Sequence, residues 1–287
     1  MDDVLNDGLI KLCHDDSDTA RIIEPRFDEA VSLLNRYIAE IELFNPAYGL
    51  VKVKDSRELV IKHILDSLAP LGIIVRLLDG IQNKGGSVLS SCSNTAAPLH
   101  IADVGSGAGL PGIPLAIALP GVNFTLIERM GRRAGFLRNT QALLGLANLE
   151  VEEAEMEKAC AARFDLITFR AFRPLEPPIL RGLSRLLRPG GHLAAYKGRR
   201  DAIDAELAAI GVCCTSCSLI KKIGFQADFY PANSVRSPFI GNFLRPQAQK
   251  IHKCNRLIGG AHSGNSEIIP CPVPFLAEER HLVVMAV

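Results

Sequence analysis

The feature that most constrains the fold is a glycine-rich segment directly after a short apolar run. Leu99–Val104 (LHIADV) is typical of a buried strand, and the next eight residues, Gly105–Gly112 (GSGAGLPG), contain four glycines before an apolar helical segment begins. Glycines at such a junction let the backbone turn tightly and approach a ligand without interference from a Cβ atom. The segment therefore predicts a strand, a ligand-binding loop and a helix in succession.

Strands and helices continue to alternate after this loop. Helical patterns follow the first three of the five strands that we expect, which are Leu99–Val104, Val122–Glu128, Phe164–Phe169, Gly191–Lys197 and His281–Val287. Such alternation predicts an α/β fold with a doubly wound, mostly parallel, Rossmann-like sheet.

The rest of the chain divides into further regions. Residues 1–24 are polar and aperiodic, and we expect a flexible tail there. Residues 25–79 predict a helical N-terminal extension, with one helix over 27–44 ended by Asn45-Pro46 and a second helix capped by Ser56. Residues 80–98 predict a loop insertion, and residues 99–287 the α/β domain, interrupted by an irregular insertion at about 225–277.

Composition and charge exclude several classes of protein. The 287 residues are 48% hydrophobic and 22% charged, with a net charge of +1, which argues against a highly basic coating protein and an acidic disordered chain. No apolar run reaches the roughly 18 residues of a membrane span, and the N-terminus lacks a secretory pattern. We therefore expect a cytoplasmic protein without membrane association.

Eight cysteines are scattered irregularly, which predicts reduced thiols in such a compartment. A zinc site is the alternative, because one CxxC pair has further candidate ligands downstream. The residues concerned are Cys214, Cys217, His252, Cys254, His262 and Cys271. No second tight pair completes a tetrahedral set, so we favour ordinary small apolar cysteines and expect no metal.

The glycine spacing bears on the cofactor. Gly107-x-Gly109-x-x-Gly112 fits the dinucleotide fingerprint, but the strand ends at Val104, and counting from Gly105 puts Leu110 where the third glycine belongs. The spacing G-x-G-x-G, preceded by Asp103, is more similar to the first motif of S-adenosylmethionine (SAM)-dependent methyltransferases. Such a cofactor would lie across the carboxyl ends of the strands.

A carboxylate to bind the ribose hydroxyls is the second requirement. Glu128 closes the next expected strand, 19 residues after Gly109, near the spacing of about 20 found for such acids. The alternative is a solvated carboxylate that the dipole of the following helix favours. Because Glu128 follows the glycine loop at this distance, we favour the ribose role.

A longer series of motifs resembles a known family. The segments DVGSGAGLPGIPLAI, FTLIERMGRRAGFLRNT and FDLITFRAF are similar to those of the small-subunit ribosomal RNA guanine-N7 methyltransferases, also called the glucose-inhibited division protein B family. KHILDSL (Lys62–Leu68), YKG (Tyr196–Gly198) and ERHLVV (Glu279–Val284) resemble the family too. The similarity covers roughly Pro25–Leu78, Leu99–Gly224 and the last ten residues.

The resemblance implies a methyltransferase sheet with a helical N-terminal extension, SAM as cofactor, and 16S ribosomal RNA or the small ribosomal subunit as partner. We also expect a monomer, although the sequence itself does not determine the oligomeric state. With the loop motif, the resemblance implies cofactor contacts at Asp103, Gly105, Gly107, Gly109, Leu110, Glu128, Met156, Glu157 and Arg170. Ungapped counting puts the adenine-flanking pair on Met156-Glu157, whereas Ala154-Glu155 looks more like the family's Ala-Glu.

This sequence also departs from the family. Phe44 stands where a tryptophan is usual, Gly49 replaces a common asparagine, and the segments 80–98 and 224–278 have no obvious counterpart. These departures leave the cofactor motifs intact and concern RNA engagement.

Basic residues are concentrated in the expected catalytic domain. Residues 129–200 contain 14 Lys and Arg against seven Asp and Glu. The RNA-binding candidates, near strand ends that share one edge of the sheet, are Arg132, Arg133, Arg138, Arg173, Lys197, Arg199 and Arg200. The alternative, a solvated helix face with local salt bridges, fits Arg181, Arg185 and Arg188 better.

The implied reaction needs little from the protein's acids and bases. Guanine N7 has a free lone pair and no proton, so its methylation requires orientation and no general base. We assign no catalytic residue; His63 and Asp66 are candidates, or they make a capping or an interdomain hydrogen bond. Remaining alternatives are a methyltransferase acting on protein or a small molecule, a nicotinamide oxidoreductase, and a non-catalytic ribosome-assembly factor.

Overall fold

The computed structural model describes residues 2–85, 98–210 and 266–287. Seven strands form one sheet in the order β3-β2-β1-β4-β5-β7-β6, in which β1 to β5 are parallel and β7 is antiparallel to β5 and β6. The strands are β1 (His100–Val104), β2 (Asn123–Ile127), β3 (Leu149–Glu152), β4 (Phe164–Arg170), β5 (Leu187–Lys197), β6 (Ser266–Pro270) and β7 (His281–Ala286). The sheet confirms the predicted doubly wound, mostly parallel α/β fold.

The strand order reverses at β1. The chain passes from β1 outward to β2 and β3, and then returns to place β4 on the other side of β1, with Ile101 opposite Leu166. In such sheets ligands bind outside the carboxyl ends of the strands at this switch point. The loops after β1, β2, β3 and β4 are therefore the segments that can build a site.

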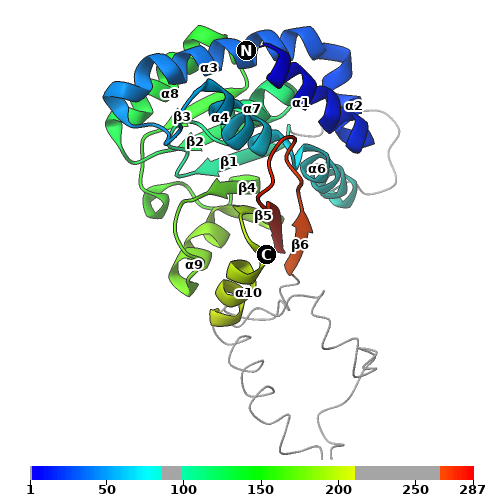
Figure 1. Cartoon of the computed structure of the whole chain (residues 1–287). Coiled ribbons are helices and arrows are strands. Elements are labelled where there is room, and N and C mark those ends of the chain that lie inside the picture. The colour runs from blue at the N-terminus through cyan, green and yellow to red at the C-terminus, as the bar shows by residue number, and fades with distance from the viewer. Residues whose placement is uncertain (1, 86–97, 211–265) are drawn as a thin grey trace, which may run out of the picture.

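Helices cover both faces of the sheet (Figure 1). The described helices are α1 (Asp2–Asp15), α2 (Ser17–Ile23), η1 (Glu24–Arg26), α3 (Phe27–Tyr48), α4 (Ser56–Leu59), η2 (Val60–Leu65), α5 (Asp66–Leu68), α6 (Leu71–Gly85), α7 (Gly112–Ala118), α8 (Gly131–Leu144), η3 (Met156–Lys158), α9 (Pro177–Leu186) and α10 (Arg200–Ala209). Neighbouring strand residues such as Ile101 and Ala102 point to opposite faces, and each enters a different hydrophobic core. Residues of α9 and α10 join the core of Ala102, and those of α7 and α8 the core of Ile101.

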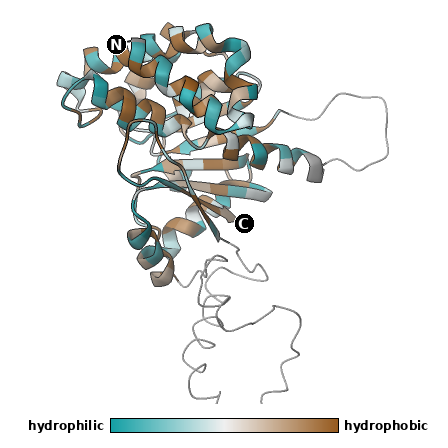
Figure 2. Ribbon diagram, turned by 45° about the vertical axis from the view of Figure 1, so that its right-hand side comes forward, coloured by the Kyte–Doolittle hydropathy of each residue, from teal (hydrophilic) through white to brown (hydrophobic). Residues whose placement is uncertain are grey.

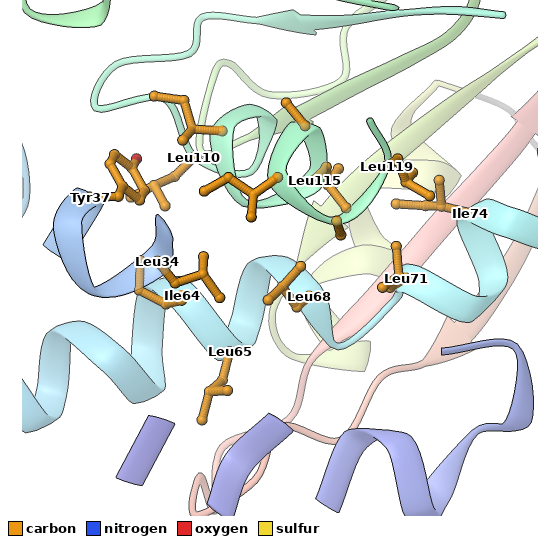
Figure 3. Close-up of a cluster of buried hydrophobic side chains, with 14 of the residues drawn as sticks. Leu34, Tyr37, Ile64, Leu65, Leu68, Leu71, Ile74, Leu110, Leu115 and Leu119 are labelled. Carbon is orange, nitrogen blue, oxygen red and sulfur yellow. The ribbon is translucent and has the colours of Figure 1, made fainter. Parts of the chain in front are cut away.

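The helices that precede β1 pack onto α7 rather than standing apart from the sheet. Every residue of α7 is buried, because the sheet lies on one side and the N-terminal helices on the other. Figure 3 shows Leu34, Ile64, Leu68 and Leu71 on one side of this shared core, with Leu110, Leu115 and Leu119 on the other. Hydrophobic and hydrophilic residues alternate along these outer helices, as amphipathic packing requires (Figure 2). The N-terminal layer is thus held in place at the switch-point edge.

The predicted flexible tail over residues 1–24 is wrong. Asp2–Asp15 and Ser17–Ile23 form α1 and α2, and Leu5, Leu9 and Leu12 are buried. α1 lies so close to η2 that a Cβ on Gly8 would be 2.3 Å from Cδ1 of Leu65. These leucines recur at helical spacing among polar residues such as Asp7 and Lys11, so their burial depends on the partner surface that η2 provides.

Several predicted boundaries also differ. α3 continues through Asn45-Pro46 to Tyr48, because Pro46 falls in the last turn, and the helix ends at Gly49 in the left-handed conformation. The next helix is capped by Asp55, whose carboxylate accepts from the N–H of Glu58, and not by Ser56. The strand β3 was not predicted, and its four residues are too few for a period-2 pattern to stand out.

Parts of the two predicted insertions belong to regular secondary structure. α6 runs on to Gly85, so residues 80–85 are helical, and residues 266–270 form β6 rather than irregular chain. Residues 86–97 and 211–265 lie outside the described residues, as do five of the six zinc candidates: Cys214, Cys217, His252, Cys254 and His262.

The described cysteines Cys13, Cys160 and Cys271 are free thiols. In the described ranges, no three His, Cys, Asp or Glu side chains come together as a metal site, and no helix is both long and apolar enough to cross a membrane.

Candidate cofactor site and adjoining cavity

The glycine loop after β1 adopts a conformation that side chains disfavour. Gly105, Gly107 and Gly109 have φ angles of +73°, +59° and +92°. A Cβ on Gly105 would lie 2.3 Å from Cδ2 of Phe172, whereas one on Gly107 would meet nothing closer than 3.9 Å. The N–H of Gly105 donates to the carbonyl of Ile127 at 2.8 Å, which ties the loop to the end of β2.

Asp103 holds the loop from below. Its side chain is buried, and Oδ2 accepts a hydrogen bond from the N–H of Gly112 at 3.0 Å, while the hydroxyl of Thr168 lies 3.5 Å from Oδ1. Burial raises the pKa of Asp103 to about 7, against the opposing effect of the hydrogen bond from Gly112. Asp103 does not line the cavity described next, so its expected part in cofactor binding is to position the loop.

Glu128 connects the loop to the end of β2. Its Oε2 accepts from the N–H of Gly107 and its Oε1 from the N–H of Met130, both at 2.9 Å. The side chain is buried and lies beside a cavity. Each carboxylate oxygen retains a second lone pair, so Glu128 can still accept hydrogen bonds from a ligand.

The first cavity lies at the carboxyl ends of β1 to β4 and has a volume of about 560 Å³. This is within the range of about 300–1,000 Å³ of small-molecule sites. Its walls include Gly105, Glu128, Met156, Phe172 and Arg173. Gly107, Gly109 and Leu110 do not line it; Leu110 is buried in the shared core beside Tyr37 (Figure 3).

Both candidate adenine-flanking pairs lie on the wall of the first cavity. Ala154-Glu155 and Met156-Glu157 each line it, so the geometry is compatible with either register. Met156 is buried, and its methyl group packs against Gly182 of α9. An apolar side chain held in this way provides a fixed surface for a flat base.

A second cavity of about 570 Å³ adjoins the first, and Ala171 lines both. The segment after β4 divides them: Arg170 faces the second cavity, and Phe172 the first. Ala171 itself has a φ of +50°, which is uncommon for a residue with a Cβ atom. Arg170 thus does not line the cavity that contains Gly105 and Glu128, and its expected contact with the cofactor stays a prediction.

Arg170 binds residues of the N-terminal layer. Its Nη1 donates to Oδ2 of Asp66 at 2.8 Å, and its Nη2 lies 3.0 Å from Nδ1 of His63. Arg280 pairs with the other oxygen of Asp66 at 3.0 Å. His63 and Asp66 thus make the interdomain contact that the sequence left open, and they make it on the wall of a cavity. Arg280 was not among the site residues predicted from the sequence, although it lies in the motif ERHLVV.

The seven RNA-binding candidates differ in their surroundings. Arg132 and Arg133 line the first cavity, and Arg132 lies over the ring of Tyr48 at 5.4 Å. The other five have carboxylate partners within 2.9–3.4 Å: Arg138 with Glu153, Arg173 with Glu157, Lys197 with Glu206, Arg199 with Asp201, and Arg200 with Asp204. The sequence does not distinguish the cations that pair with a carboxylate from those that do not, because partners such as Glu153 and Glu157 lie on other segments of the chain.

Comparison with known proteins identifies the family. A family model described as GidB, rRNA small subunit methyltransferase G, matches residues 30–222. The chain belongs to this family. The GidB family is one of SAM-dependent methyltransferases, which confirms the predicted cofactor and the enzyme class.

Curated GidB relatives support the assignment over much of their length. A ribosomal RNA small subunit methyltransferase G from Treponema denticola is 38% identical over 230 residues, covering 76% of this chain and 85% of its own. Proteins of the same name from Treponema pallidum (strain Nichols) and Stenotrophomonas maltophilia (strain K279a) are 41% and 40% identical. They cover 61% and 58% of this chain, and 71% and 68% of their own lengths.

Among solved structures, an O-methyltransferase from Bacillus cereus in complex with SAH is similar at 15% identity and a TM-score of 0.45. The match covers 88% of this chain and 91% of that one.

Proposed function

We propose that this protein transfers a methyl group from SAM to N7 of a guanine in 16S ribosomal RNA of the small subunit. The observation that carries the proposal is the pair of adjoining cavities at the switch point. One contains the glycine loop and Glu128, the other a cluster of basic and polar side chains, and both reach Ala171. Family membership supports the substrate class, because the relatives named above are small-subunit ribosomal RNA methyltransferases.

The residues of the first cavity fit SAM. Glu128 can accept hydrogen bonds from both ribose hydroxyls, and the segment Ala154–Glu157 offers one apolar wall for the adenine. Gly105 gives the ligand room where any side chain would collide with Phe172. Bound there, SAM supplies an electrophilic methyl group on a sulfonium centre.

The transfer itself is a displacement at the methyl carbon. The N7 lone pair forms the new N–C bond while the S–C bond breaks, and its electron pair remains on sulfur. Positive charge passes from the sulfonium to the purine, and no proton moves. The protein's task is to align N7 with the methyl group, and such orientation can contribute on the order of 7–11 kcal/mol to the barrier reduction. We therefore assign no general acid or base.

The N-terminal helices take part in this site. His63 and Asp66 come from η2 and α5, and they contact Arg170 at the end of β4. We propose that this helical layer is a wall of the active site rather than a separate binding domain. Because one chain supplies both cavities, we also propose that the acting unit is a monomer, and that it works in the cytoplasm, where small subunits are assembled.

Labelled SAM with the purified protein tests the function. Small ribosomal subunits and naked 16S ribosomal RNA are incubated at several salt concentrations, and the labelled base is mapped by cleavage chemistry specific for N7-methylguanine. We expect one labelled guanine, and much less label with Glu128→Ala at the same SAM concentration. Absence of label from every substrate would contradict the proposal and favour a non-catalytic assembly factor, and label on another atom would contradict the N7 assignment.

A further inference from the structure

The second cavity is the part of the site that cofactor binding leaves unexplained. It opens at the carboxyl ends of β4 and β5, and its walls include His63, Asp66, Arg170, Tyr196 and Arg280. Ala171 forms part of both cavities. A base in the second cavity would therefore face a methyl group presented from the first cavity across this residue.

The contact with Arg170 determines which nitrogen of His63 carries its proton. A guanidinium group can only donate hydrogen bonds, so Nδ1, which lies 3.0 Å from Nη2 of Arg170, must be the acceptor. Burial, reinforced by the charge of Arg170, lowers the pKa of His63 to about 4, so the ring is neutral at physiological pH. A neutral imidazole whose Nδ1 accepts a hydrogen bond carries its single proton on Nε2.

This Nε2–H is available to a ligand. Nε2 of His63 makes no hydrogen bond to any described residue. It is also not one of the buried side-chain atoms without a partner, so the atom is accessible. The two oxygens of Asp66 pair with Arg170 and Arg280, and these ion pairs hold both guanidinium groups at the wall of the cavity. The wall of the cavity formed by His63, Arg170 and Arg280 therefore presents hydrogen-bond donors.

A cavity wall that presents hydrogen-bond donors fits the major-groove edge of guanine better than that of adenine. Guanine has two acceptors, N7 and O6, side by side on its major-groove edge, whereas adenine has N7 beside an amino group that donates. A donor directed at O6 accepts guanine and rejects adenine, whose amino group would leave it unpaired. Holding O6 also fixes the direction of N7, because the two atoms share one edge.

We propose that the second cavity receives the target guanine and that His63 determines its specificity by donating Nε2–H to O6. This inference rests on the proposed function. Arg170 is a positioning residue, since it holds the imidazole in the required tautomer without touching the base. A guanine within a stacked helix would have to leave the stack to enter.

A functional-group cycle tests the inference. The guanine mapped in the wild-type reaction is replaced by inosine, which keeps O6, or by 2-aminopurine, which lacks it, and kcat/KM is measured for wild type, His63→Ala and His63→Gln. For wild type we expect inosine to react within about threefold of guanine, and 2-aminopurine about 10- to 100-fold more slowly. For guanine, kcat/KM of His63→Ala should fall below the wild-type value by about the same factor. For 2-aminopurine it should fall little further, because loss of the His63 ring and loss of O6 remove the same hydrogen bond.

Three controls distinguish a specificity role of His63 from a purely structural one. SAM affinity by calorimetry should be unchanged in His63→Ala, because His63 does not line the first cavity. His63→Gln, whose amide can donate, should recover part of the preference for guanine over 2-aminopurine. His100→Ala removes another half-buried imidazole, at the opposite end of the sheet, and should leave that preference unchanged.

The positioning role of Arg170 has its own readout. Nitrogen NMR of the His63 ring should show a protonated Nε2 and a bare Nδ1 in the wild type, and a mixture of tautomers in Arg170→Met. The inference is overturned if His63→Ala keeps the full preference for guanine over 2-aminopurine, or if it loses SAM affinity together with all activity. If wild type methylates no guanine at all, the proposed function itself has failed, which is a different result.

Discussion

The carboxylate of Glu128 accepts a hydrogen bond from the backbone N–H of Gly107 at 2.9 Å, joining the end of β2 to the loop that follows β1. The same side chain also accepts from the N–H of Met130. Glu128 therefore has two tasks, since it shapes the glycine loop and leaves further lone pairs facing the first cavity.

Glu128→Ala should weaken SAM binding about 10- to 100-fold, because hydrogen bonds to a charged group contribute about 1.5–3 kcal/mol. Glu128→Gln keeps one acceptor oxygen and should lose less. Titration calorimetry measures both. Glu150→Ala on the neighbouring strand β3, exposed and away from the cavity, is the matched control. Equal affinities for wild type and Glu128→Ala would refute the ribose assignment.

Gly105→Ala and Gly107→Ala form a second matched pair. Both positions have a positive φ, so each substitution should destabilise the fold by about 1 kcal/mol. Only at Gly105 would the new Cβ lie 2.3 Å from the ring of Phe172, on the wall of the first cavity. We expect Gly105→Ala to lose SAM binding at least tenfold more than Gly107→Ala. Identical affinities would show that the ring of Phe172 moves aside freely.

Asp103→Asn should change how stability depends on pH. The pKa of Asp103 is about 7 in the folded protein and near 3.8 in the unfolded chain, so between these values the folded state binds more protons. The contribution of Asp103 to the free energy of unfolding therefore falls as pH rises from about 4 to 7, by at most about 4 kcal/mol.

Urea unfolding of wild type and Asp103→Asn at intervals from pH 4 to 8 measures this effect. The variant should gain stability relative to wild type up to about pH 7, and the difference should then level off. Asp201→Asn, with its exposed side chain, serves as control. A difference that stays constant with pH would mean that Asp103 is already ionised in the folded protein.

Two triple-alanine variants compare the unpaired and the paired cations in RNA binding. The first removes the cluster beside the first cavity, Arg129, Arg132 and Arg133, for which no described carboxylate forms an ion pair. The second removes Lys197, Arg199 and Arg200, each with a carboxylate partner. We expect both to weaken RNA binding. The second variant should leave SAM affinity unchanged, because none of its three residues lines the first cavity.

The salt dependence of RNA affinity distinguishes the two sets. Each phosphate contact contributes roughly 0.7–0.9 to the slope of log K against log salt, so the first variant should lower the slope by about 2–3. The second should lower it less, because its cations already have counter-charges. If the second variant lowers the slope more, the paired cations exchange their carboxylates for phosphates.

Leu9→Ala tests whether the N-terminal segment belongs to the folded core. Leu9 on α1 is 1% exposed, and its loss should destabilise the protein by about 2–5 kcal/mol. Ile10→Ala on the same helix removes a side chain that is 56% exposed, and should change stability by less than about 0.5 kcal/mol. Thermal or urea unfolding measures the stability of both variants. Equal losses of stability would support the flexible tail that was first expected for residues 1–24.

Much of the first cavity could be predicted from the sequence, because its features depend on neighbours along the chain. A strand, a glycine turn and a helix follow one another within about 20 residues, and the acid at the end of the next strand follows at a fixed spacing. The fold class follows from the same alternation. A strand as short as β3 carries too little pattern to be seen in this way.

The second cavity was decided by tertiary structure. Arg170 and Asp66 are 104 residues apart in sequence, and neither shows which partner it will choose until η2 and α5 pack beside β4. The same holds for Leu9, whose burial requires the surface of η2, and for Lys197, whose charge is met by Glu206 on the following helix. Local patterns are set by backbone geometry over a few residues, whereas pairing and burial depend on which distant surfaces the packed core brings together.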